Sequence, residues 1–192
     1  MHQWPVRIDG IRSCYKAFIL KFKFHAISSA ALYLCTMSED LDIINGTKEE
    51  KYESLFPQIE AVVKGEPDVI ANMGNIAAAL KEQFNWLWIG FYRVVEDELV
   101  VGPFQGPVAC TRIRKGKGVC GMSWQDAEPL VVGDVLEFKG HISCSSLSRS
   151  EIVVPIIKNG EVMAVLDADS EFVDHFDETD RVWLEKITLL LA

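Results

Sequence analysis

Three of the chain's cysteines, Cys110, Cys120 and Cys144, lie in its second half. Cys144 stands in the polar segment HISCSS of residues 141–146, which is typical of a loop that a ligand can reach. Nearby hydroxyls and an imidazole can stabilise a thiolate, the reactive form of cysteine. Many cysteines, however, are simply small buried apolar residues. The residue types alone therefore leave both a reactive and an inert Cys144 open.

Three carboxylates follow this segment: Glu151, Asp167 and Asp169. The two aspartates are two residues apart on an expected strand, so their side chains share one face. Asn159-Gly160 predicts a two-residue hairpin turn, which places Asp167 opposite Ile152 and Glu151 within about one residue of the pair. Like charges held together raise one another's pKa and attract a cation. We expect either a site for an ammonium ligand and a proton donor, or solvated strand ends.

A zinc site and an aromatic wall are further interpretations of this region. Structural zinc usually draws its ligands from pairs two to four residues apart, and the cysteine gaps here are far longer, so we expect no metal. A thiol–disulfide cycle requires only that two sulfurs approach each other. Trp88 and Tyr92 lie four residues apart on an expected strand and share a face. They either pack in the core or line a pocket for a methyl-bearing side chain.

The composition is that of a globular protein, with 49% hydrophobic and 24% charged residues in 192. The net charge is −9, but residues 1–36 sum to +4 and the remaining residues to −13. An acidic body argues against nucleic-acid binding, which requires cationic groups. No apolar run of ~18 residues predicts a membrane span. The cysteine pattern is not that of a secreted disulfide framework, so we expect a reducing, cytoplasmic location.

The first 36 residues differ from the rest. They are basic and acid-poor, as organellar presequences are, and Met37 opens the acidic region abruptly. We interpret residues 1–36 as a basic extension, either a presequence or a stretch before the working start. Residues 37–192 then form a single domain.

The elements expected from periodicity and turn residues are helices at both ends and strands between them. Gly102–Pro107 is expected to break strand pairing, and Pro57 to kink or restart the first helix. The expected helices cover residues 48–64, 68–83, about 115–126 and a segment after Asp177; the expected strands cover 86–95, 98–101, 108–113, 129–132, 152–157 and 161–167, with an aperiodic loop at 133–149. This order predicts an α+β fold in which helices cover one face of an antiparallel sheet.

The region from about Lys48 to Leu191 resembles the GAF-domain free methionine-(R)-sulfoxide reductases. The resemblance rests on several motifs and on the spacing of the three cysteines. The matching stretches are residues 88–92 (WIGFY), 102–106 (GPFQG), 116–121 (GKGVCG), 140–144 (GHISC), 148–155 (SRSEIVVP) and 160–170. A generic GAF sensor module lacks this combination.

The resemblance implies a GAF fold with about six antiparallel strands, a homodimer, and reduction of free methionine sulfoxide without a metal or organic cofactor. Cys144 matches the cysteine that attacks the sulfoxide, Cys110 the resolving cysteine, and Cys120 an auxiliary thiol. The substrate-binding positions of the family match Glu151, Asp167, Asp169, Trp88 and Tyr92. A thioredoxin-type dithiol would regenerate the enzyme. The alternative is a GAF module that binds a small ligand or senses redox state without catalysis.

Overall fold

The computed structural model describes residues 40–140, 142 and 144–192. The basic extension, His141 and Ser143 lie outside the described residues. The expected boundary of the domain at residue 37 therefore stays a prediction.

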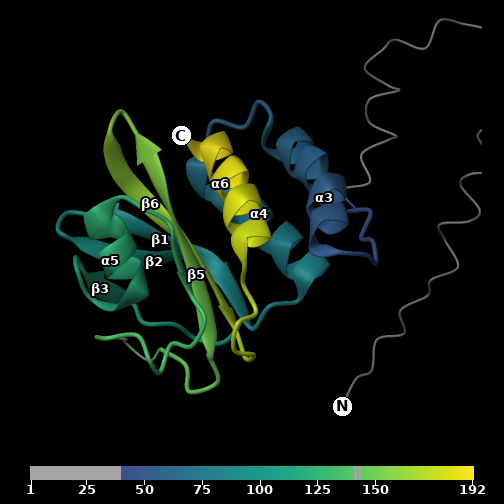
Figure 1. Ribbon diagram of the computed structural model, residues 1–192. Helices are drawn as coiled ribbons and strands as arrows, with labels where there is room; N and C mark the ends of the chain where they lie inside the picture. The colour runs from purple at the N-terminus through teal and green to yellow at the C-terminus, as the bar shows by residue number, and fades with distance from the viewer. Residues whose placement is uncertain (1–39, 141, 143) are drawn as a thin grey trace, which may run out of the picture. The chain divides into compact units, whose positions relative to one another are not determined.

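Six antiparallel strands form one sheet in the order β3-β2-β1-β6-β5-β4. The two long central strands, β1 and β6, pair with each other, so segments far apart in the sequence lie side by side (Figure 1). The strands are β1 (Trp88–Val95), β2 (Glu98–Gln105), β3 (Arg112–Arg114), β4 (Leu130–Val132), β5 (Ser150–Lys158) and β6 (Glu161–Ser170). The expected antiparallel sheet is confirmed.

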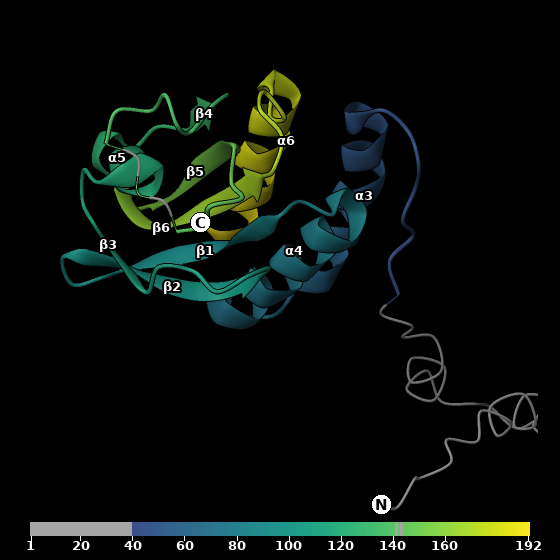
Figure 2. The same ribbon diagram turned by 90° about the horizontal axis from the view of Figure 1, so that it is seen from below.

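Helices lie on both faces of this sheet (Figure 2). One face carries α3 (Lys48–Val63), α4 (Val69–Phe84) and α6 (Glu178–Thr188), which ends in the short helix η2 (Leu189–Leu191). The opposite face carries α5 (Gly118–Asp126). The element order suggested helices on one face only, whereas the structure has helices on both faces.

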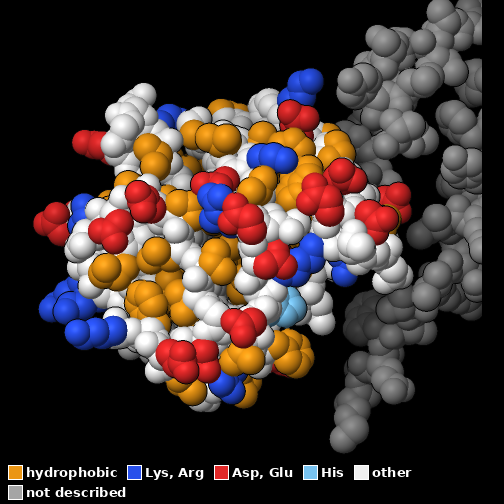
Figure 3. Space-filling model, in the orientation of Figure 1, with side chains coloured by type: hydrophobic (Ala, Val, Ile, Leu, Met, Phe, Trp, Pro, Cys, Tyr) orange, Lys and Arg blue, Asp and Glu red, His pale blue; other side chains and the backbone are white. Residues whose placement is uncertain are grey.

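The alternation of side chains along each strand produces two apolar cores. On β1, Ile89 and Phe91 pack in the core under α3, α4 and α6, whereas Trp88 and Tyr92 pack in the core under α5. The surface between the apolar patches carries interleaved acidic and basic side chains on the face shown in Figure 3. The acidic side chains are thus distributed over this face and do not gather in one patch.

Helix α3 runs through Pro57 without a break, so the expected restart at that residue is wrong. Pro57 is exposed, which leaves the carbonyl that loses its N–H partner on the solvent side. Next to it, Gln58 Nε2 donates to the Ser54 carbonyl oxygen at 2.9 Å. The expected caps are present: Asp68 accepts from the Ile70 N–H at 2.8 Å, and Asp177 caps α6.

Strand β2 continues through Gly102 and Pro103 to Gln105, so the expected break in the ladder is wrong. The β1–β2 register shifts between Gly90 and Tyr92, which marks a bulge that accommodates the proline. The expected strand over residues 108–113 is reduced to β3. Residues 106–111 contain no strand or helix, and Cys110 therefore lies in a loop.

A bulge also changes the β5–β6 hairpin. The register shifts between Ile156 and Ile157, so every pair beyond it moves by one residue. Asp167 lies opposite Val153 instead of Ile152. Glu151 lies directly opposite Asp169. The turn at Asn159-Gly160 is correct, but a turn signal does not reveal a bulge several residues away.

Candidate active site

The predicted site residues meet at a small cavity on the α5 face of the sheet, ≈40 Å³ in volume. Strands β1, β5 and β6, helix α5 and the two loops that carry cysteines contribute its walls. The residues from the sequence prediction that line it are Trp88, Tyr92, Cys120, Cys144, Glu151, Asp167 and Asp169. Cys110 joins them through a bond to Cys144. The roles assigned to these residues stay predictions.

Cys110 and Cys144 form a disulfide, with Cα atoms 5.4 Å apart. They come from two loops separated by 34 positions in the sequence. Cys144 is exposed, whereas Cys110 is half-buried and packs against the core under α5. Cys144 is therefore accessible to solvent and also lines the cavity.

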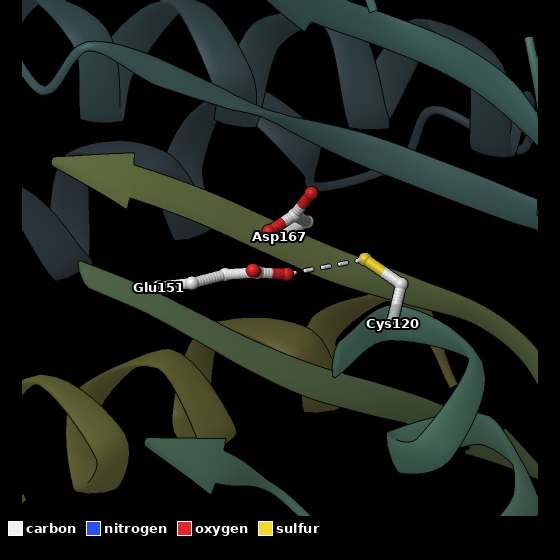
Figure 4. A group of neighbouring side chains, drawn as sticks. All are labelled: Cys120, Glu151 and Asp167. Atoms are coloured by element: carbon white, nitrogen blue, oxygen red, sulfur yellow. Dashed lines mark hydrogen bonds between the residues drawn. The ribbon is translucent and has the colours of Figure 1, made fainter. Parts of the chain in front are cut away.

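The three carboxylates project from the ends of β5 and β6. The extended backbone turns Asp167 and Asp169 to the same side, and pairing between the strands adds Glu151 across from Asp169. Glu151 and Asp167 are each only 6% exposed. From the first turn of α5, the Cys120 Sγ lies 3.7 Å from Glu151 Oε1 (Figure 4). The group thus forms a buried polar floor under the cavity.

Burial raises the pKa values of Glu151 and Asp167 well above their ordinary range, because water no longer stabilises the charged forms. The neighbouring carboxylates raise them further by repulsion. Burial also raises the pKa of Asp169, to about 6, against a lowering contribution from the Ser148 hydroxyl. Glu151 and Asp167 therefore keep their protons to higher pH than free carboxyls do, and Asp169 loses its proton near pH 6.

Burial, followed by repulsion from Asp167 and Glu151, also raises the pKa of Cys120. This thiol is therefore a neutral hydrogen-bond donor. Ligand atoms of Cys120, Glu151 and Asp167 lie within 4.8 Å of one another, which is the geometry of a group that can hold a metal ion. Metal binding would require the thiol and the carboxyls to lose protons that burial favours. The wide spacing of these residues in the sequence gave no metal signal.

The aromatic pair of β1 forms the wall beside this floor. The rings of Trp88 and Tyr92 are stacked, with centroids 5.9 Å apart, and Phe104 also stacks on the indole. Trp88 is 5% and Tyr92 2% exposed. Each ring also donates a hydrogen bond to the loop that carries Cys110, at Pro107 O and Cys110 O respectively. Their interaction with this loop was not anticipated from the sequence.

Ser148 is a site residue that our sequence reasoning missed. It is buried, lines the cavity, and its hydroxyl donates to Asp169 Oδ1. Its only sequence signal was its position at the start of the matching stretch 148–155. The side chain links the loop of Cys144 to the acidic floor.

Comparison with known proteins shows the family to which this chain belongs. Residues 68–192 match the GAF domain family. "GAF domain-containing protein A" of Dictyostelium discoideum is 58% identical over 156 residues, which cover 81% of this chain and 99% of the relative. The "Free methionine-R-sulfoxide reductase" of Escherichia coli is 38% identical over 145 residues, covering 75% of this chain and 88% of the relative. The chain belongs to the GAF-domain free methionine-R-sulfoxide reductase family.

A solved structure of the same family supports the fold. The free methionine-R-sulfoxide reductase of Neisseria meningitidis, determined in complex with its substrate, is 52% identical and superposes with a TM-score of 0.78. The match covers 80% of this chain and 93% of that chain. The GAF fold expected from the resemblance is confirmed. Among the residues described here, no helix is both long and apolar enough to cross a membrane.

Proposed function

We propose that this enzyme reduces free L-methionine-(R)-sulfoxide to methionine with Cys144 as nucleophile and Cys110 as resolving cysteine. The observation that carries the proposal is the Cys110–Cys144 disulfide at a cavity with a buried acidic floor. A disulfide between these loops is the oxidised state in which such a cycle ends. Family membership supplies the substrate class, because named relatives are free methionine-R-sulfoxide reductases.

In the first step, the Cys144 thiolate attacks the sulfoxide sulfur while an acid of the cluster protonates the oxygen. Transfer of that oxygen releases methionine and leaves a sulfenic acid on Cys144. The raised pKa values of Glu151 and Asp167 suit proton donation, because these groups keep their protons to higher pH than free carboxyls do. The three carboxyls titrate as a group, so the donor is a property of the cluster.

In the second step, the Cys110 thiolate attacks the sulfenic sulfur of Cys144. The new disulfide forms as the S–O bond breaks, and the departing hydroxide takes up a proton to become water. The two electrons that reduce the sulfoxide thus come from two thiols. A thioredoxin-type dithiol then reduces the disulfide, for which the exposed Cys144 offers access.

Substrate recognition follows from charge and burial. A free amino acid carries an ammonium group that a peptide-bound methionine lacks. The negative charge on Asp169 attracts this ammonium at neutral pH. The wall of Trp88 and Tyr92 packs against the apolar methyl end. We therefore expect the enzyme to exclude peptide-bound methionine sulfoxide.

A stereospecific assay tests the function. The protein is supplied with each sulfoxide epimer of free methionine and with an N-acetylated peptide, and methionine release is coupled to oxidation of reduced thioredoxin. We expect turnover of the free R epimer alone, and its loss in Cys144→Ser. Turnover by Cys144→Ser would contradict the assignment of the nucleophile. Ligand retention without turnover of either epimer would instead favour the non-catalytic GAF module.

Three further properties are part of the same proposal. Residues 37–192 form the working enzyme, with residues 1–36 as a basic extension. The protein acts as a homodimer in the cytoplasm. Measuring the mass in solution of a chain that starts at Met37 tests both the assembly and the dispensability of the extension.

A further inference from the structure

The loop of residues 106–111 carries Cys110 between β2 and β3 and has no helix or strand of its own. Its middle is exposed, with Val108 88% accessible. A loop of this kind samples many conformations unless other groups hold it. Disulfide formation nevertheless requires the Cys110 sulfur to reach Cys144, with Cα atoms 5.4 Å apart in the bonded state. Some contact outside the loop must therefore place Cys110.

Two side chains of β1 supply that contact. The Tyr92 hydroxyl donates to the Cys110 carbonyl oxygen at 3.1 Å, and Trp88 Nε1 donates to the Pro107 carbonyl oxygen at 3.1 Å. The two rings stand four residues apart on one face of the strand, so their donors reach the two ends of residues 107–110. This pair of bonds ties an irregular loop to the centre of the sheet.

Two glycines make room for the arrangement. A Cβ on Gly90 would meet Trp88 Cη2 at 2.7 Å and Phe104 Cβ at 2.3 Å, and a Cβ on Gly106 would meet Trp88 Cδ1 at 2.8 Å. Gly106 also has a backbone φ of +137°, which residues with a side chain rarely adopt. Glycine is thus required at both positions so that the Trp88 indole can pack against the loop.

The Tyr92 hydroxyl is a dependable donor. It is attached to a ring that is 2% exposed and stacked on Trp88, so its position is fixed by packing. Burial, with repulsion from Asp167 and Cys120, raises the pKa of Tyr92 above its ordinary value. The phenol therefore keeps its proton, and a carbonyl oxygen is a suitable acceptor.

We propose that Tyr92 is a positioning residue for Cys110 and acts in the second chemical step. Its hydrogen bond fixes the backbone of Cys110 so that the thiolate can attack the Cys144 sulfenic sulfur. In that step the S–S bond forms, the S–O bond breaks, and hydroxide leaves and becomes water. The inference rests on the proposed function for the origin of the sulfenic acid. It adds a task to Tyr92 beyond forming the wall of the cavity.

Tyr92→Phe removes the hydroxyl and keeps the ring, so it separates the two tasks. Reduced enzyme is mixed rapidly with methionine-(R)-sulfoxide without a reductant, and two rates are followed in quenched samples. Methionine release reports the first step, and loss of alkylatable thiols with a mass consistent with a disulfide reports the second. We expect one methionine per site and disulfide formation slowed roughly tenfold, a larger factor than any slowing of methionine release.

The chain offers a matched control in Tyr52→Phe. Tyr52 is also fully buried, and its hydroxyl donates to Asp180 Oδ1 at 3.0 Å on the opposite face of the sheet. The same chemical change there removes a buried hydrogen bond without touching the Cys110 loop. We expect both half-reactions of this variant to run at wild-type rates. Equal slowing of disulfide formation in the two variants would overturn the proposal, because general destabilisation would then explain it.

A second way of forming the sulfenic acid makes the test independent of the substrate. One equivalent of hydrogen peroxide oxidises the Cys144 thiolate directly, and the rate of disulfide closure is then measured in the same way. We expect Tyr92→Phe to accumulate a sulfenic acid that dimedone traps, whereas wild type closes quickly. Wild-type closure rates in Tyr92→Phe, or slowed methionine release with normal closure, would overturn the proposal. Failure of wild type to release methionine while peroxide still drives closure would count against the proposed substrate alone.

Discussion

The two faces of the sheet bury polar groups in opposite ways. Under α3, α4 and α6, Asp180 is fully buried and satisfied: it accepts from the Tyr52 hydroxyl at 3.0 Å and from Lys48 Nζ. Under α5, Asp167 is 6% exposed, and its Oδ1 has no hydrogen-bond partner among the described residues. One face uses its buried acid to join helices. The other keeps an acid short of partners.

The pKa values of two acids also differ between the faces. Burial acts to raise the pKa of Asp177, the exposed N-cap of α6, but hydrogen bonds from Lys48 and the Thr179 N–H outweigh it and lower the pKa. On the site face, burial raises the pKa of Asp169 to about 6, although Ser148 acts against it. An unsatisfied buried polar group costs about 1–3 kcal/mol. Asp167 Oδ1 on the site face therefore carries a cost that Asp180, with its partners, does not.

Asp180→Ala tests the stabilising side of this comparison and should have the largest effect. The change leaves Lys48 without one of its carboxylates and the Tyr52 hydroxyl without its acceptor. Removing one partner of a buried pair costs about 3–5 kcal/mol, so we expect a loss of about 3 kcal/mol in the free energy of unfolding. Urea denaturation checks it. Below the unfolding transition, sulfoxide reduction per folded molecule should be unchanged; a catalytic defect would show that the faces are not separable.

Asp169→Asn tests the acidic cluster on the α5 face through the pH dependence of the free energy of unfolding. The folded protein holds the Asp169 proton more tightly than the unfolded chain, because the pKa is raised from 3.8 to about 6. The free energy of unfolding therefore falls as the pH rises from about 4 to about 6, and it stays lower above that range. A pKa rise of this size corresponds to ~3 kcal/mol, and the asparagine variant should lack that part of the fall.

Urea unfolding of the oxidised protein at pH 4, 5, 6 and 7 measures this prediction. The remaining slope in the variant includes contributions from Glu151 and Asp167, whose pKa values burial raises, and from His175, whose pKa burial lowers. If the free energy of unfolding depended on pH in the same way in wild type and in Asp169→Asn, the pKa of Asp169 would not be raised in the folded protein.

Ser148→Ala should have the smallest effect. The variant removes the hydroxyl that donates to Asp169 Oδ1, so the pKa of Asp169 should rise further. A protonated Asp169 attracts an ammonium less, and the acidic limb of kcat/KM should move to higher pH. We expect a loss of about threefold at pH 6 that disappears by pH 8. A uniform loss at every pH would assign Ser148 to loop structure instead.

The fold was largely predictable because its signals are local. Apolar periodicity, the caps Asp68 and Asp177, and the Asn159-Gly160 turn each depend on a few neighbouring residues. Two of the errors concern bulges, which depend on pairing between strands; others are the restart expected at Pro57 and the strand expected over residues 108–113. The bulge in the β5–β6 hairpin moved Asp167 from Ile152 to Val153 and made Glu151 the partner of Asp169.

Most residues that meet at the cavity were predictable from the sequence, but Ser148 and the contacts between the residues were not. Cys144, Cys110 and the three acids were identified from residue type and motif resemblance, and the structure brings them to one cavity. The hydrogen bonds of Tyr92 and Trp88 to the Cys110 loop could not be inferred, because residues 108–113 were expected to form a strand with its carbonyls in a ladder. A sequence pattern shows which residues share a face; it does not show which carbonyl a hydroxyl reaches.

The most direct test of the account is the stoichiometry of Cys110→Ser with methionine-(R)-sulfoxide. This variant keeps the proposed nucleophile and the acidic floor and lacks the proposed resolving thiol. With reduced thioredoxin present, we expect a burst of about one methionine per site, a sulfenic acid on Cys144 by mass spectrometry, and then a stall. Sustained turnover with an intact thioredoxin cycle would contradict the assignment of Cys110 and transfer resolution to Cys120.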